Sequence, residues 1–143
     1  MSIVRSHGCR STEPNRPPGR LLVYLEAAIE PYVPPAARVA SDALRNSIQI
    51  GEAAGLLAES LQGSRLLLVC DNVERIIADE GSVVVLSALA RYLPADVNLV
   101  LISRTSVPLD LGSISDLTRV GELGGEADLA FDADEAAEAL RLI

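Results

Sequence analysis

The chain has 143 residues, a formal net charge of −8, and a hydrophobic share of 49%. This length suits one domain with a real core, and the negative charge disfavours attraction of the whole chain to a nucleic-acid backbone. Aromatic residues make up only 3% of the chain, which leaves few rings for stacking on single-stranded bases.

The two cysteines and the single histidine exclude several kinds of site. Cys70 falls in an apolar run and Cys9 in a polar segment, so no structural disulfide is expected. His7 has no partner residues around it, so a zinc site and an activated serine both lack the groups they need. No run reaches the roughly 18 apolar residues of a membrane span, and the N-terminus lacks the apolar core of a signal peptide. We therefore expect a cytoplasmic protein with no membrane partner.

The first half of the chain is predicted to be helical after an irregular start. Residues 1–20 mix Ser, Gly, Pro, Asn and Arg without apolar periodicity, which indicates a disordered or poorly packed lead-in. From residue 21 apolar residues recur at helical spacing until Pro31 interrupts them. A second helical region runs from about 36 to 61. Its two glycines, Gly51 and Gly55, leave one long helix or two shorter helices open.

A strand, a helix and a second strand are predicted next. A strand is predicted over residues 65–70. Its apolar run, 66–70, is followed at once by Asp71, which is typical of a central parallel strand buried on both faces. A helix over about 79–92 ends before Pro94, and a second strand covers 97–102. Two strands joined in this way form a right-handed βαβ unit and lie parallel as neighbours. We therefore expect Asp71 and Arg104, which follow these strands, at the same edge of the sheet.

The last part of the chain is predicted to contain one helix. Pro108 and Gly112 indicate a loop or a short helix, and residues 117–120 are a candidate strand. Asp132 is a suitable N-cap for a helix over 133–142 with acidic residues in its first turn. The alanine-rich stripe of this helix either faces solvent or packs on a neighbouring domain.

Three segments in this order resemble the STAND class of signalling nucleoside-triphosphatases, especially the large ATP-dependent bacterial transcriptional regulators of the maltose-activator and LuxR type. Residues 66–74 (LLLVCDNVE) are similar to a Walker B strand, and residues 98–105 (NLVLISRT) to a sensor strand that ends in Ser-Arg. Residues 127–140 (ADLAFDADEAAEAL) are similar to the segment that opens the helical domain behind the ATPase core. Residues 20–29 also look like the family's helix before the Walker B strand, so the likeness extends from about residue 20 to the last residue.

The resemblance implies an α/β fold, namely a partial P-loop NTPase-like three-layer fold with a short parallel sheet flanked by helices. It places a partial NTPase core over residues 21–125, after the lead-in over 1–20. It places the start of a following helical domain over 126–143.

The resemblance also implies roles for three residues, with ATP and Mg²⁺ as the cofactors of the parent family. Asp71 would hold magnesium, mostly through metal-bound water, because this ion keeps much of its hydration shell. Arg104 would sense the γ-phosphate through bidentate hydrogen bonds. Asn72 stands where the family often has a second acid; an amide can orient water but cannot take its proton.

The chain departs from the family in one decisive respect. All 12 of its basic residues are Arg, so it has no lysine for the phosphate-binding loop G-x-x-x-x-G-K-[ST]. We expect this loop and the family's first strand to be absent before residue 20, and the DNA-binding effector part to lie beyond Ile143. The chain then resembles a fragment of a larger regulator that does not hydrolyse ATP by itself. Its partners would be the missing parts of that parent or another protein, with DNA bound only through the absent effector domain.

Other hypotheses remain open at this point. The chain could be a stand-alone degenerate P-loop-like module that binds a partner protein through an uncovered surface. A receiver-like domain with Asp71 as phosphate acceptor would want a lysine opposite the acid, which the chain lacks. Asp71 could also be an ordinary loop acid and Arg104 a surface arginine. Asn72 and Glu74 are more simply explained as loop residues, with Glu74 near the start of the following helix.

Overall fold

The computed structural model describes residues 2–6, 19–109, 120–125, 130 and 132–141. The chain divides into two compact units, residues 1–113 and residues 114–143. Both strands that carry the predicted site belong to the first unit. Within the described part of the chain, no helix is both long and apolar enough to cross a membrane.

The helices of the first unit begin and end where local sequence signals place them. α1 (Arg20–Ile29) ends just before Pro31, and the predicted region 36–61 is two shorter helices, α2 (Val39–Arg45) and α3 (Ile50–Glu59). α4 (Glu80–Tyr92) is capped by Asp79, whose carboxylate accepts a hydrogen bond from the Ser82 amide at 2.9 Å. Two short 3₁₀ helices, η1 (Pro34–Ala36) and η2 (Val73–Arg75), lie in the connections.

The three strands among the described residues of the first unit form one parallel sheet in the order β1-β2-β3. β1 (Ser2–Ser6) and β3 (Val97–Leu101) flank the central β2 (Leu66–Cys70), and Leu68 lies opposite both Val4 and Leu99. The predicted parallel pairing of the two later strands is thus confirmed.

Strand β1 corrects the prediction for the N-terminal segment. An irregular lead-in was predicted over residues 1–20 and no strand before residue 20, whereas residues 2–6 pair with β2 over its whole length. Five residues that include two serines and an arginine give no readable alternation, so the strand is specified by its partner rather than by its own pattern. Residues 7–18 lie outside the described residues.

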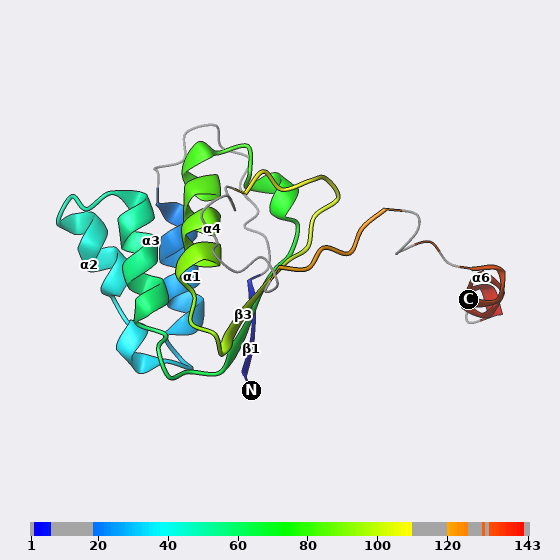
Figure 1. Cartoon of the computed structure of the whole chain (residues 1–143), viewed down its shortest axis with the longest axis horizontal. Coiled ribbons are helices and arrows are strands. Elements are labelled where there is room, and N and C mark those ends of the chain that lie inside the picture. Colours follow the sequence, from blue (N-terminus) through cyan, green and yellow to red (C-terminus); the bar gives the residue numbers. More distant parts are fainter. Residues whose placement is uncertain (1, 7–18, 110–119, 126–129, 131, 142–143) are drawn as a thin grey trace. The chain divides into compact units, whose positions relative to one another are not determined.

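The helices α1 to α4 lie on one side of the sheet (Figure 1). Right-handed crossovers between strands in sequential order place both connections on the same face of a sheet, which accounts for this arrangement. Leu66, Leu68 and Cys70 of β2 are buried, whereas the alternate residues Leu67 and Val69 are only half-buried. The largest fully buried side chains of the core are Leu22, Ile29, Leu57, Leu61, Leu68, Leu86, Leu89, Val73 and Val85.

A buried carboxylate joins α1 to α2. Glu26 is 4% exposed, and its Oε1 atom accepts hydrogen bonds from the amides of Ala40 at 2.6 Å and Ser41 at 3.2 Å. The Ser41 hydroxyl also donates to this carboxylate. The N-cap residue of α2, Arg38, has a left-handed backbone and makes no side-chain cap bond. Glu26 therefore satisfies the free amides of α2 from another helix, and its negative charge suits the helix N-terminus.

The second unit contains helix α6 (Ala133–Arg141), which confirms the predicted C-terminal helix. Asp132 is its N-cap: one carboxylate oxygen accepts from the amides of Asp134 at 2.9 Å and Glu135 at 2.8 Å. The Glu135 side chain accepts from the Asp132 amide in return, which completes a capping box. Of the candidate strand over 117–120, residues 117–119 lie outside the described residues, and Val120 is not in a strand.

Candidate functional site

The site is built where β2 and β3 end at the same edge of the sheet. Cys70 lies opposite Leu101, and the pairing continues beyond both strands. The Ile102 amide donates to the Cys70 carbonyl at 2.8 Å, and the Val73 amide donates to the Ile102 carbonyl at 3.0 Å. The two segments that carry Asp71 and Arg104 therefore leave the sheet side by side, from adjoining strands that run in the same direction.

Asp71 and Asn72 form a tight turn at this edge. The exposed Asp71 carboxylate accepts a hydrogen bond from the Asn72 amide at 2.7 Å. Asn72 has a left-handed backbone, with φ 55° and ψ 44°. Asparagine tolerates this conformation better than most residues with a side chain, so the turn itself is a local reason for its presence.

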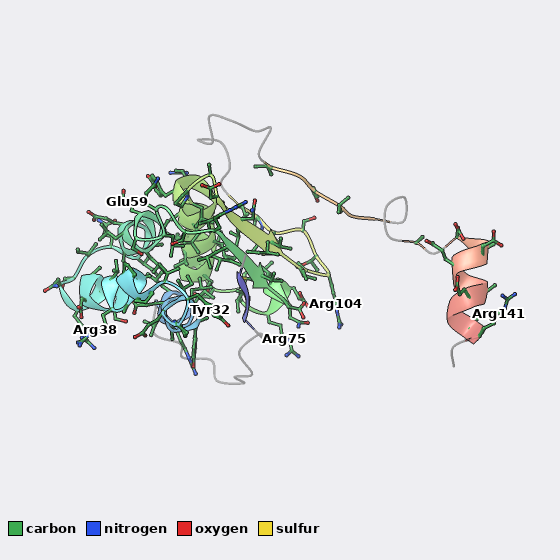
Figure 2. All side chains as sticks on the ribbon, turned by 90° about the horizontal axis from the view of Figure 1, so that it is seen from below. Tyr32, Arg38, Glu59, Arg75, Arg104 and Arg141 are labelled. Carbon is green, nitrogen blue, oxygen red and sulfur yellow. The ribbon has the colours of Figure 1, made fainter. Side chains whose placement is uncertain are left out.

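Arg104 pairs with Glu74. The Arg104 amide donates to Oε2 of Glu74 at 3.4 Å, and the Arg104 Nε atom lies 3.8 Å from Oε1. The Arg104 side chain is 86% exposed and projects outward (Figure 2), whereas the Glu74 side chain is 20% exposed. The structure thus brings Arg104 to Glu74, while the Asp71 carboxylate closes its own turn.

Glu74 is the residue at this edge whose contact was missed at the sequence level, where it was interpreted as a loop acid. It lies in η2, directly after the turn that holds Asp71. A usable signal was present: residues of opposite charge follow two strands that were predicted to be parallel neighbours. Such residues come together at the carboxyl edge of a sheet even when 30 positions separate them.

This edge offers the exposed carboxylate of Asp71, the guanidinium groups of Arg75 and Arg104, and few protein ligands for a metal. Among the described residues, no three His, Cys, Asp or Glu side chains are grouped so that they could hold a metal ion. A magnesium ion needs only one or two protein carboxylates when water and phosphate oxygens complete its octahedron. Asp71 therefore fits a magnesium ion that is shared with a phosphate ligand, and does not fit a closed protein cage.

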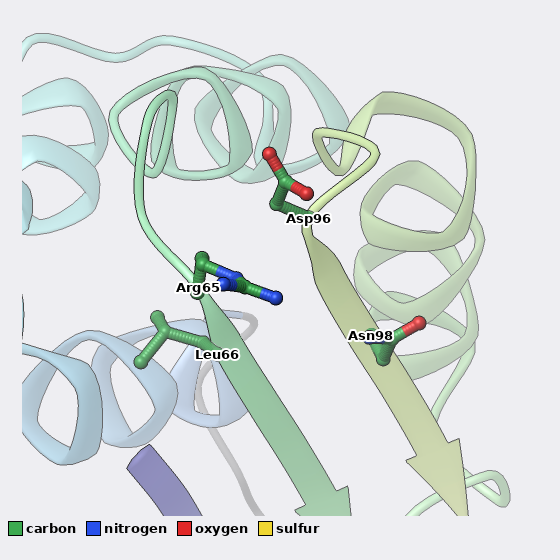
Figure 3. A pocket seen from close by; sticks show the side chains of 4 residues that line it. All are labelled: Arg65, Leu66, Asp96 and Asn98. Atoms are coloured by element: carbon green, nitrogen blue, oxygen red, sulfur yellow. The ribbon is translucent and has the colours of Figure 1, made fainter. Parts of the chain in front are cut away.

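A small hollow lies at the opposite end of the same two strands. It has a volume of about 100 Å³ and is lined by Arg65, Leu66, Asp96 and Asn98 (Figure 3). These residues are at the amino ends of β2 and β3. Ligands of parallel α/β sheets bind outside the carboxyl ends of the strands, so this hollow is separate from the predicted site.

Cys70 is a core residue next to the site rather than a reactive group. Its side chain is buried, and burial raises the pKa of the thiol to about 11 from an ordinary value of 9.0. Since the thiolate is the nucleophilic form, this raised pKa and the burial both make the native thiol inert. In a Cys9→Ser background we expect iodoacetamide at pH 8 to modify Cys70 far more slowly in native protein than in urea, as measured by mass spectrometry.

The same pKa change predicts how stability depends on pH. The folded chain holds the Cys70 proton more tightly than the unfolded chain, so its contribution is fully present below about pH 9 and is lost as pH rises towards 11. Cys70→Ala should remove the part of the stability loss at alkaline pH that comes from ionisation of this thiol. Equal alkaline loss in the two proteins would contradict the assignment.

Comparison with protein-family models, with curated proteins and with solved structures finds no significant match to this chain.

Proposed function

We propose that this chain is the magnesium- and sensor-bearing part of a STAND-type ATPase module from a LuxR-type transcriptional regulator, and that it does not hydrolyse ATP by itself. One observation carries the proposal: Asp71 and Arg104 follow neighbouring parallel strands at one carboxyl edge. This is the edge at which such folds bind nucleotide phosphates.

The partly exposed apolar residues on the second face of the sheet support a partial three-layer fold. Val100 is 40% exposed and Ile102 is 50% exposed, and they follow the same alternation as the half-buried Leu67 and Val69. Parallel sheets are normally covered by helices on both faces, and apolar residues on both faces of β2 fit that rule. The three described strands also run in sequential order, so they contain no switch point at which a nucleotide crevice forms. A complete crevice would need further strands beside the three described strands.

The residue inventory explains why the chain alone would bind ATP weakly. Without a lysine, the contact that reaches the β- and γ-phosphates is missing. When bound, magnesium would neutralise phosphate charge beside Asp71, and Arg104 would contact the terminal phosphate. In an assembled module, these contacts would distinguish ATP from ADP and bias a signalling switch. Asn72 orients water without accepting its proton, so hydrolysis would stay slow even there.

Nucleotide titration tests this proposal. We expect no ATP turnover above background with this chain, and binding of MgATP only at millimolar concentration. An N-terminally extended protein that supplies a Gly-Lys-Ser/Thr loop should gain magnesium-dependent binding, measured by calorimetry with and without EDTA. In that protein, Asp71→Ala and Arg104→Gln should weaken binding.

Asp96→Ala is the matched control, because Asp96 is an exposed acid at the opposite end of the same sheet. The proposal fails if Asp71→Ala and Asp96→Ala behave alike in the extended protein. It also fails if the chain alone hydrolyses ATP and this turnover disappears in Asp71→Ala.

The half-exposed apolar residues of β2 and β3 also favour a second candidate, a degenerate P-loop-like module that binds a partner protein through this face. The two candidates differ in what surrounds the chain in its gene. A reading frame that continues upstream into a phosphate loop, or downstream into a helix-turn-helix, favours the regulator. Clean boundaries around a well-folded monomer favour the interaction module.

A further inference from the structure

We infer that Glu74 is a positioning residue that holds Arg104 in the ligand-free state, and that an anionic phosphate group binds Arg104 by taking the place of Glu74. The inference rests on the proposed function, because it assumes that Arg104 meets a phosphate ligand. In this arrangement the Glu74 carboxylate competes with the phosphate for Arg104, a role that the family resemblance does not imply.

The contacts of Glu74 support the holding role. One carboxylate oxygen accepts from the Arg104 amide at 3.4 Å, and the other lies 3.8 Å from the Arg104 Nε atom. The carboxylate therefore touches both the backbone and the side chain of the same residue. The backbone of Glu74 is held in place as well. Glu74 lies in η2, and the preceding residue, Val73, is buried and donates an amide hydrogen bond to the Ile102 carbonyl.

The difference in exposure supports the exchange. The Glu74 side chain is mostly covered, whereas Arg104 is open to solvent, so a ligand can approach the guanidinium without moving the sheet edge. An exposed ion pair contributes only about 0.2–1 kcal/mol, so a phosphate that offers bidentate hydrogen bonds can displace the carboxylate. The Arg104 amide can keep its contact with Glu74 while the guanidinium turns away. Glu74 would thus keep the segment in place and lower the affinity of Arg104 for weak anions.

The test compares Glu74→Gln with the wild-type chain. Glutamine keeps the size of the side chain and one acceptor oxygen but removes the charge. We expect the Nε–Hε NMR signal of Arg104 to move towards the position of a free arginine. In a titration with inorganic triphosphate and magnesium, we expect the affinity of Glu74→Gln to rise about twofold to fivefold, which corresponds to the loss of one exposed ion pair.

Glu59→Gln is the matched control, because it removes one exposed negative charge at the end of α3, away from the sheet edge (Figure 2). If Glu59→Gln raises the affinity as much as Glu74→Gln does, the effect is one of net charge and the inference is overturned. It is also overturned if the Arg104 signal does not respond to Glu74→Gln.

Arg104→Gln separates this inference from the proposed function. If Arg104→Gln weakens triphosphate binding but Glu74→Gln leaves it unchanged, the sensor role stands and the competitor role of Glu74 is wrong. If triphosphate binding does not depend on Arg104 in any variant, the sensor role itself is wrong, and the exchange fails with it. If Glu74→Gln raises the triphosphate affinity and the double variant Glu74→Gln, Arg104→Gln loses this rise, both the sensor role of Arg104 and the competitor role of Glu74 are supported.

Discussion

Leu68→Ala should lower the free energy of unfolding by about 2–5 kcal/mol, the range for removing a large aliphatic side chain from a packed core. Leu68 is at the centre of β2, it is fully buried, and its neighbours on both sides are strands. The surrounding helices cannot collapse into the space without moving the sheet. Urea denaturation followed by circular dichroism measures this loss.

Leu67→Ala is the matched control on the same strand. Its side chain points to the opposite face, where it is only half-buried and does not belong to the core cluster. We expect Leu67→Ala to lower the free energy of unfolding by less than about half as much as Leu68→Ala does, because less apolar area returns to water. Equal losses for the two variants would mean that both faces of β2 are packed, which would contradict the one-sided helical layer.

The elements that the sequence predicted well are those that carry their own signals. The strand β2 is an uninterrupted apolar run, and α4 has an N-cap aspartate before it and a proline after it. These features act over a few residues, so they are readable without knowledge of the fold. The parallel pairing of β2 and β3 then follows from the length of the connecting helix.

The missed features depend on contacts between residues that are distant in the sequence. Strand β1 has little pattern of its own and is defined by its pairing with β2, some 60 positions away. Arg104 meets Glu74 across 30 positions, and Glu26 meets Ala40 across 14. The sequence could show that two charged residues follow neighbouring strands. Which group each side chain contacts depends on the backbone conformation of the few residues after each strand. The αL conformation of Asn72 is one such detail, and it directs the backbone away from Asp71 and into η2.

Glu26 illustrates how a charged residue becomes part of the core of this unit. At the sequence level it is one acid within an apolar helix, and solvent exposure would be the default interpretation. In the structure it is buried among the first amides of α2, whose own N-cap residue offers no side-chain acceptor. A buried carboxylate is tolerated there because several donors and the positive end of a helix surround it.

Glu26→Ala should therefore destabilise the first unit by about 2–4 kcal/mol, as estimated from hydrogen bonds to a charged group and from a lost helix cap. The variant leaves the amides of Ala40 and Ser41 without this acceptor, and it opens space between α1 and α2. Glu26→Gln should recover part of the loss, because its amide oxygen can still accept from one of these amides. It no longer carries the charge that suits the helix N-terminus.

Glu30→Ala is the comparison that isolates the cap, since Glu30 ends the same helix and is exposed. We expect it to change the unfolding free energy by less than about 0.5 kcal/mol, as is usual for surface substitutions. Hydrogen exchange gives a second, local measurement. In Glu26→Ala the amides of Ala40 and Ser41 should lose more protection than the fall in global stability accounts for. The amides of β2 should lose only as much protection as that fall in global stability. If Glu26→Ala is as mild as Glu30→Ala, the α1–α2 junction is held by apolar packing alone, and the carboxylate is incidental to it.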